Sequence, residues 1–173
     1  MIASWAPSDI QLSDITIIRM NTELQAELQK LDGYLLAISA LKADGDSFQC
    51  YYLGQIPLED ALSPLSDLLR IEENTLKLFP ADELTLSGLP SSLRQWLGTR
   101  RRLCELGDTQ EIDIRLFDGF VEAMNEELGR PEQWMRAGAG PAYQPGRHLC
   151  AIWDVYVFYA KGHSYAVHCS WDS

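Results

Sequence analysis

Apolar and polar residues recur along the chain with two different periods, and each period indicates one kind of secondary structure. A period of two residues is typical of strands with one buried face, and a period of 3.6 residues is typical of amphipathic helices. The first pattern predicts strands over residues 14–20, 34–41, 48–56, 75–79, 84–86, 111–117, 149–160 and 163–171. The second pattern predicts helices over residues 21–31, 57–69, 90–97 and 118–129.

Glycine and proline residues indicate how these elements are joined. An Asp-Gly pair at 44–45 separates the second and third predicted strands, and such a pair is typical of a hairpin turn. Pro64 falls inside a helical pattern and has no N–H to donate, so we expect a break there. Gly129 follows the last helical pattern and is expected to end that helix. Residues 130–147 are rich in glycine and proline and predict a loop, with one short helix at 131–136.

Together these elements predict an α+β fold in which residues 1–173 form a single domain. We expect a mainly antiparallel sheet with a C-terminal β-hairpin (149–171), packed by several short helices. The chain has 46% apolar and 23% charged residues, which is an ordinary composition for a globular protein with a core. It shows neither a secretory signal pattern nor a run of roughly 18 apolar residues, so we expect a cytoplasmic protein that binds no membrane.

The last hairpin contains most of the residues that are able to do chemistry. A tight turn at Lys161 and Gly162 puts the even residues of its first strand on the same face as the odd residues of its second strand. Asp154 is therefore expected opposite Cys169, and His168 is expected on the other face. Because His168 and Cys169 point in opposite directions, they cannot bind one metal ion, and we predict neither a metal site nor a cofactor. Asp154 is expected to be wet or to pair with an arginine, since a buried carboxylate needs a partner.

The net charge of the chain and its distribution indicate which class of partner fits. The chain carries 25 acidic and 14 basic residues, for a net charge of −11. Residues 59–83 carry −5 and residues 105–132 carry −7, whereas residues 84–104 carry +4. Nucleic acid is excluded as a general partner, because binding it depends on neutralising phosphates with lysine and arginine. A basic protein fits better, since opposite potentials steer the encounter of two proteins.

The helix predicted over 118–129 carries a line of acidic residues beside its apolar stripe. Like charges at a spacing of four residues repel each other, which a purely structural helix avoids easily. A basic partner that docks on this line would explain it. Acidic residues of the strand predicted before the helix would belong to the same docking surface. The predicted partner-binding residues are Glu111, Asp113, Asp118, Glu122, Glu126 and Glu127.

The sequence supports three functional hypotheses. The first is a non-enzymatic cytosolic binding or inhibitor protein that docks a basic partner, such as a toxin or an effector enzyme, and occludes its site. Bacterial immunity proteins neutralise toxins in this way, and the analogy is one of size and charge, not of sequence. The second is a small enzyme or ligand-binding domain, and the third is a subunit of a larger assembly whose oligomeric state the sequence leaves open. The residues expected near the enzymatic or ligand site are Asp154, His148, His168, Arg100, Arg101 and Arg102.

Overall fold

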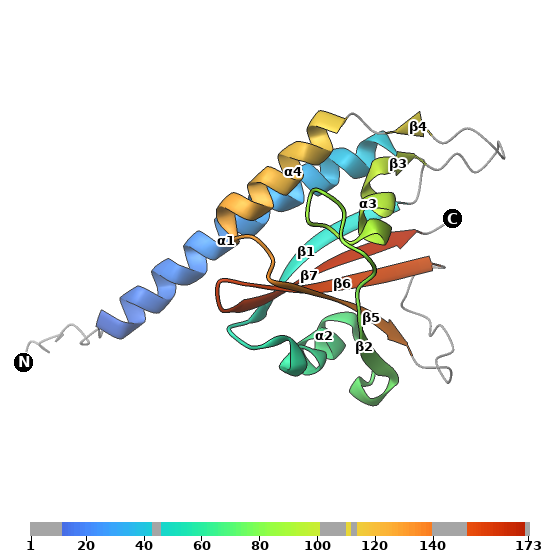
Figure 1. Cartoon of the computed structure of the whole chain (residues 1–173). Helices are drawn as coiled ribbons and strands as arrows, with labels where there is room; N and C mark the ends of the chain where they lie inside the picture. The colour runs from blue at the N-terminus through green and yellow to red at the C-terminus, as the bar shows by residue number, and fades with distance from the viewer. Residues whose placement is uncertain (1–11, 43–45, 101–109, 112–113, 140–151, 172–173) are drawn as a thin grey trace, which may run out of the picture.

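The computed structural model describes residues 12–42, 46–100, 110–111, 114–139 and 152–171 (Figure 1). Its helices are α1 (Leu12–Leu41), α2 (Leu62–Leu69), α3 (Ser91–Gly98) and α4 (Ile114–Glu127), with short 3₁₀ turns η1 (Leu58–Asp60) and η2 (Glu73–Thr75). Its strands are β1 (Asp46–Gly54), β2 (Leu76–Pro80), β3 (Thr99–Arg100), β4 (Gln110–Glu111), β5 (Gln133–Ala139), β6 (Ile152–Ala160) and β7 (His163–Trp171). None of the described helices is long and apolar enough to cross a membrane.

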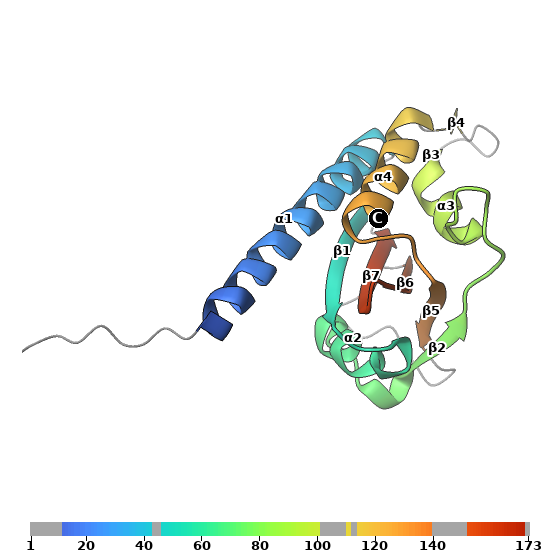
Figure 2. The same cartoon turned by 60° about the vertical axis from the view of Figure 1, so that its left-hand side comes forward.

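Five strands form one antiparallel sheet in the order β1-β7-β6-β5-β2. Helices α1, α3 and α4 cover one face of this sheet, and α2 with η1 lies on the other face (Figures 1 and 2). The fold is therefore α+β with an antiparallel sheet, as the sequence predicts. A separate two-stranded ladder joins β3 to β4.

The two faces of the sheet support two apolar cores. On the face toward α1, α3 and α4, the largest buried side chains of β6 are Tyr156 and Phe158, and the Phe158 ring lies 4.7 Å from that of Trp134 on β5. On the opposite face, Val155 and Val157 pack with Leu65 of α2 and other apolar residues around it. Burial of alternate residues on both faces explains why β6 is apolar along nearly its whole length.

The C-terminal hairpin forms as predicted from the parity of its residues. Lys161 and Gly162 occupy the turn with φ angles of +49° and +84°, the left-handed values that a two-residue type I′ turn requires. Asp154 lies directly opposite Cys169, and Val155 lies opposite His168. Cys169 and His168 thus point to opposite faces of the sheet.

The N-terminal prediction of two strands around a short helix is wrong. Residues 14–20 and 34–41 belong to α1, a continuous helix of 30 residues. Leu31, Leu35 and Ile38 are completely buried at helical spacing, which shows that tertiary packing of one apolar stripe outweighs the strand preference of the β-branched residues. The predicted hairpin through 44–45 does not form, because β1 pairs with β7 instead.

Two further element predictions are wrong around α4. Residues 114–117 begin α4 instead of completing a strand, since Phe117, Phe120 and Met124 are buried at helical spacing. Of the predicted strand, Glu111 is extended, in β4 (Gln110–Glu111). The short helix predicted at 131–136 is replaced by β5, whose pairing with both β6 and β2 supplies hydrogen bonds that a loop lacks. Gly129 follows α4 with φ of +91°, so its role in ending the helix is confirmed.

The remaining predictions concern the segment around α2 and the residues after β2. The break predicted at Pro64 lies earlier, at Ala61 between η1 and α2. Pro64 instead falls in the first turn of α2, where a missing N–H costs nothing. Residues 84–86 form no strand; one isolated bridge joins Leu84 to Pro90. Residues 140–147 of the loop predicted over 130–147 lie outside the described residues.

Candidate functional site

Helix α4 presents the predicted acidic line to solvent. Asp118, Glu122 and Glu126 are exposed, while the apolar stripe of the same helix is buried in the core. A Cβ atom at Gly119 would lie 2.8 Å from the ring of Tyr34, so this glycine lets α4 approach α1 closely. The spacing of charges in the sequence therefore predicts correctly which side of α4 faces outward.

Helix α1 brings further acidic side chains beside the end of α4. Burial raises the pKa of Glu27, and the neighbouring carboxylates of Glu127 and Glu23 raise it further, while Lys161 and His163 act to lower it. Glu27 thus has both like charges and cations near it. We call the exposed acids of α4 together with Glu23, Glu27 and Glu127 the α1–α4 acidic surface.

Part of the α1–α4 acidic surface is paired within the chain. Lys30 on α1 donates to the Glu127 carboxylate, and its Nζ lies 3.9 Å from Oε2 of Glu126. Lys161 donates to the backbone carbonyl of Glu127 at 3.3 Å. The side chain of Glu126 is still 73% exposed, so an approaching cation can reach it. The sequence pattern missed Lys30 because the contact joins residues that lie 97 positions apart.

The structure does not describe the side chains of the two predicted site residues that precede α4. Glu111 lies in the short strand β4, opposite Thr99, and the structure does not describe its side chain. Asp113 lies outside the described residues. The described part of the predicted acidic site therefore lies on α4, next to acidic residues of α1.

Asp154 is held by two donors from other elements, Arg136 of β5 and Trp96 of α3. Oδ1 accepts hydrogen bonds from Nε of Arg136 at 2.8 Å and from Nη2 of the same guanidinium. Oδ2 accepts a hydrogen bond from Nε1 of Trp96 at 2.7 Å. The expectation of an arginine partner is confirmed, and these bonds link the sheet to α3.

A second polar cluster lies beside Asp154 at the start of α3. Burial acts to raise the pKa of Asp82, but hydrogen bonds from Ser91 and Ser92 outweigh it and lower that pKa. Ser92 also accepts a hydrogen bond of 2.8 Å from the Tyr156 hydroxyl. Asp82 therefore stays charged and caps α3.

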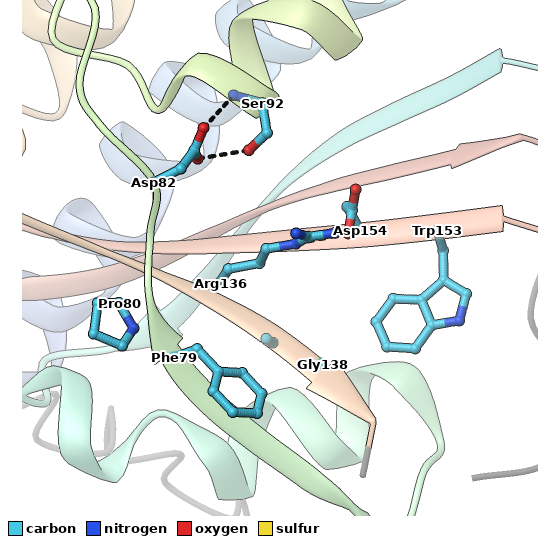
Figure 3. Close-up of a pocket in the computed structure, with 9 residues that line it drawn as sticks. Phe79, Pro80, Asp82, Ser92, Arg136, Gly138, Trp153 and Asp154 are labelled. Carbon is cyan, nitrogen blue, oxygen red and sulfur yellow. Dashed lines mark hydrogen bonds and ion pairs between the residues drawn. The ribbon is translucent and has the colours of Figure 1, made fainter. Parts of the chain in front are cut away.

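Both clusters border a pocket of about 580 Å³, which is the size of a small-ligand site (Figure 3). Phe79, Pro80 and Trp153 also line it. The Asp154 carboxylate is neutralised by Arg136, which favours a supporting role, whereas Asp82 accepts from neutral hydroxyl and amide donors and keeps its negative charge beside the pocket.

The residues proposed for an enzymatic or ligand site are not brought together by the described structure. Asp154 faces α3, whereas His168 lies on the opposite face of the sheet, where burial lowers its pKa. His148, Arg101 and Arg102 lie outside the described residues, and the side chain of Arg100 in β3 is not described. Within the described ranges, no group of three or more His, Cys, Asp or Glu side chains is arranged to hold a metal ion.

The two described thiols are expected to be unreactive. Cys50 and Cys169 are buried and free, and burial raises the pKa of each, with Asp32 adding to the effect at Cys50 and Asp154 at Cys169. The thiolate is the reactive form, so iodoacetamide at pH 8 should label these two cysteines only after denaturant is added. Peptide mapping by mass spectrometry checks this result, and rapid labelling of either residue in the folded protein would contradict it.

Comparison with known proteins gives no relative. No family model matches the chain, and it has no significant similarity to a curated protein or to a solved structure.

Proposed function

We propose that this protein is a non-enzymatic cytoplasmic binding protein that docks a basic protein partner through the α1–α4 acidic surface. The observation that carries the proposal is the gathering of like charges on two packed helices. Glu127 and Glu23 act to raise the pKa of Glu27, against the opposite effect of Lys161 and His163. Helix α4 adds three exposed carboxylates, one of which lies 3.9 Å from Nζ of Lys30. Such self-repulsion lowers stability slightly, and a cationic partner would relieve it.

Docking of this kind acts by occlusion. A partner such as a toxin or an effector enzyme would be inhibited when its basic surface is covered, with no chemistry performed on it. The negative field speeds encounter, and salt screens it over about 8–10 Å at physiological ionic strength. The enzymatic alternative draws no comparable support, because Asp154 is engaged by Arg136 and Trp96.

Reversal of two charges on α4 tests the proposal. The immobilised protein is incubated with a cleared cell lysate at low and at high salt, and the retained proteins are identified and titrated. We expect a basic partner whose affinity falls steeply with salt and falls about 10- to 100-fold in the Glu122→Lys, Glu126→Lys variant. Thermal melting establishes that the variant is folded.

A matched variant separates a local effect from one of net charge. Asp67→Lys with Glu72→Lys changes the total charge equally, at exposed positions on and after α2. This pair should retain the partner with near-normal affinity. Normal binding by the α4 variant, or an equal loss in both variants, would contradict docking at α4.

A further inference from the structure

Strand β2 forms one edge of the five-stranded sheet. Within the described ranges it pairs only with β5, and it lies away from α4 in both views of the fold (Figures 1 and 2). Lys77, Phe79 and Pro80 are exposed, and the Phe79 ring is a large apolar group with an exposed fraction of 49%. An edge strand of this kind is a template on which another strand can pair.

The hydrogen-bond pattern identifies which backbone groups of β2 point outward. The Ala81 N–H donates to the Trp134 carbonyl at 3.3 Å, and alternation in an antiparallel pair then directs Phe79 and Lys77 toward β5. The N–H and C=O of Leu78 therefore point away from the sheet. The next outward-pointing residues of β2 are Leu76 and Pro80. The Leu76 N–H bonds to the Glu73 carbonyl, and Pro80 has no N–H, so neither offers a donor to an added strand. Leu78 is therefore the centre of the edge that has no strand partner among the described residues.

Two pockets border this edge; the first lies mainly toward α3 but also includes Ala137 and Trp153 of the α2 side, and the second lies on the α2 side. The first is the pocket of about 580 Å³ that contains Arg136 and Asp82 (Figure 3). The second has a volume of about 410 Å³ and is lined by Leu58 and Leu62, which belong to the elements on the opposite face. Phe79 lines both pockets. Successive side chains of a strand added at β2 would point alternately toward these two pockets.

Charge indicates what kind of strand fits. Residues 59–83 include seven acidic and two basic residues. Asp82 lines the first pocket, where the guanidinium of Arg136 is neutralised by Asp154. Glu59 and Lys77 both line the second pocket, so its charges balance. The first pocket also offers aromatic rings, against which a cationic side chain can pack. The second is lined mainly by apolar side chains and suits a branched aliphatic group.

We propose that β2 binds an extended basic segment of a partner protein by strand addition. The backbone of the segment exchanges hydrogen bonds with Leu78. Its lysine or arginine side chains enter the pocket beside Asp82, and its intervening aliphatic side chains enter the pocket beside Leu58 and Leu62. Lys77 and Pro80 limit indiscriminate pairing along the rest of the edge. This surface is distinct from α4, and the inference holds whether or not α4 docks a partner.

A designed peptide tests the inference directly. The probe is a fluorescently labelled octapeptide that alternates lysine with valine, and its binding is measured by anisotropy at low salt. We expect saturable binding with amide chemical-shift changes centred on Leu78. N-methylation of alternate peptide amides should weaken binding about tenfold, since it removes the hydrogen bonds on one edge. An octapeptide that alternates glutamate with valine should not bind.

Variants of Leu78 supply the matched comparison. Leu78→Pro removes the outward N–H, and with it the leucine side chain that packs on the second core, at a position where an edge strand tolerates proline; it should weaken binding about tenfold. Leu78→Val keeps the N–H and should bind as the wild type does, with both variants checked by thermal melting. If the proline variant does not fold, the N-methylated peptide on the wild-type protein decides the question.

Three outcomes would overturn strand addition at β2. They are equal binding of the N-methylated peptide, equal binding of the glutamate peptide, and loss of peptide binding in the Glu122→Lys, Glu126→Lys variant. The last result would place the peptide on the α1–α4 acidic surface and would favour the proposed function while excluding this one. Normal binding of the peptide by that α4 variant supports a separate site at β2.

Discussion

Replacing Lys42 with alanine is expected to lower the free energy of unfolding by about 3–5 kcal/mol, the usual effect of removing one partner from a buried ion pair. Nζ of Lys42 lies 3.4 Å from Oδ2 of Asp46, and both side chains are only 1% exposed. The ammonium also donates to the Trp96 carbonyl and lies 5.1 Å from the centre of the Phe48 ring. Without it, the Asp46 carboxylate is left buried beside an apolar core. Equilibrium unfolding in urea measures the change.

A double substitution separates the unpaired charge from lost packing. Lys42→Met combined with Asp46→Asn removes both charges and keeps most of the volume, so it should recover much of the stability lost in Lys42→Ala. A loss below about 1 kcal/mol in Lys42→Ala, the value typical of a surface pair, would show that water reaches this pair.

Replacing Trp96 with alanine is expected to cost a similar amount, about 3–5 kcal/mol, by opening a cavity in the core. The Trp96 side chain is 4% exposed, and its ring meets that of Phe48 edge-on with 6.3 Å between their centres. The indole N–H is one of the donors that hold Asp154, so the substitution also weakens the link between α3 and the sheet. Urea unfolding again measures the effect.

The phenylalanine variant divides this cost between packing and hydrogen bonding. Trp96→Phe keeps an aromatic ring in the core but removes the N–H, and should cost about 1–3 kcal/mol. Equal stability of Trp96→Phe and the wild type would mean that Arg136 alone satisfies the Asp154 carboxylate.

The part of the fold that the sequence predicts best is the C-terminal hairpin. Its register follows from a local turn at Lys161 and Gly162 and from the strict alternation of strand side chains, so neighbouring residues contain all the information needed. The outward side of α4 is predictable for the same reason, since Asp118, Glu122 and Glu126 recur at helical spacing.

The elements that the sequence misassigns are those whose state depends on distant partners. Residues 34–41 are apolar at many positions, and a short apolar run fits a strand as well as a buried helix. The contact of α1 with β1 and α4 decides between them. Lys30 beside Glu127 and the open edge at β2 were likewise beyond reach, because each results from segments that are far apart in the chain.

The position of β7 between β1 and β6 has a consequence for biosynthesis. Among the described strands, β1 pairs only with β7. Tyr52 and His163, for example, are 111 residues apart in the chain and are joined by a hydrogen bond of 3.0 Å. A ribosome must therefore translate through residue 171 before β1 can be completed. Until then the emerging polypeptide carries an unpaired strand that contains Phe48 and Cys50, and an unpaired apolar strand of this kind is prone to aggregate.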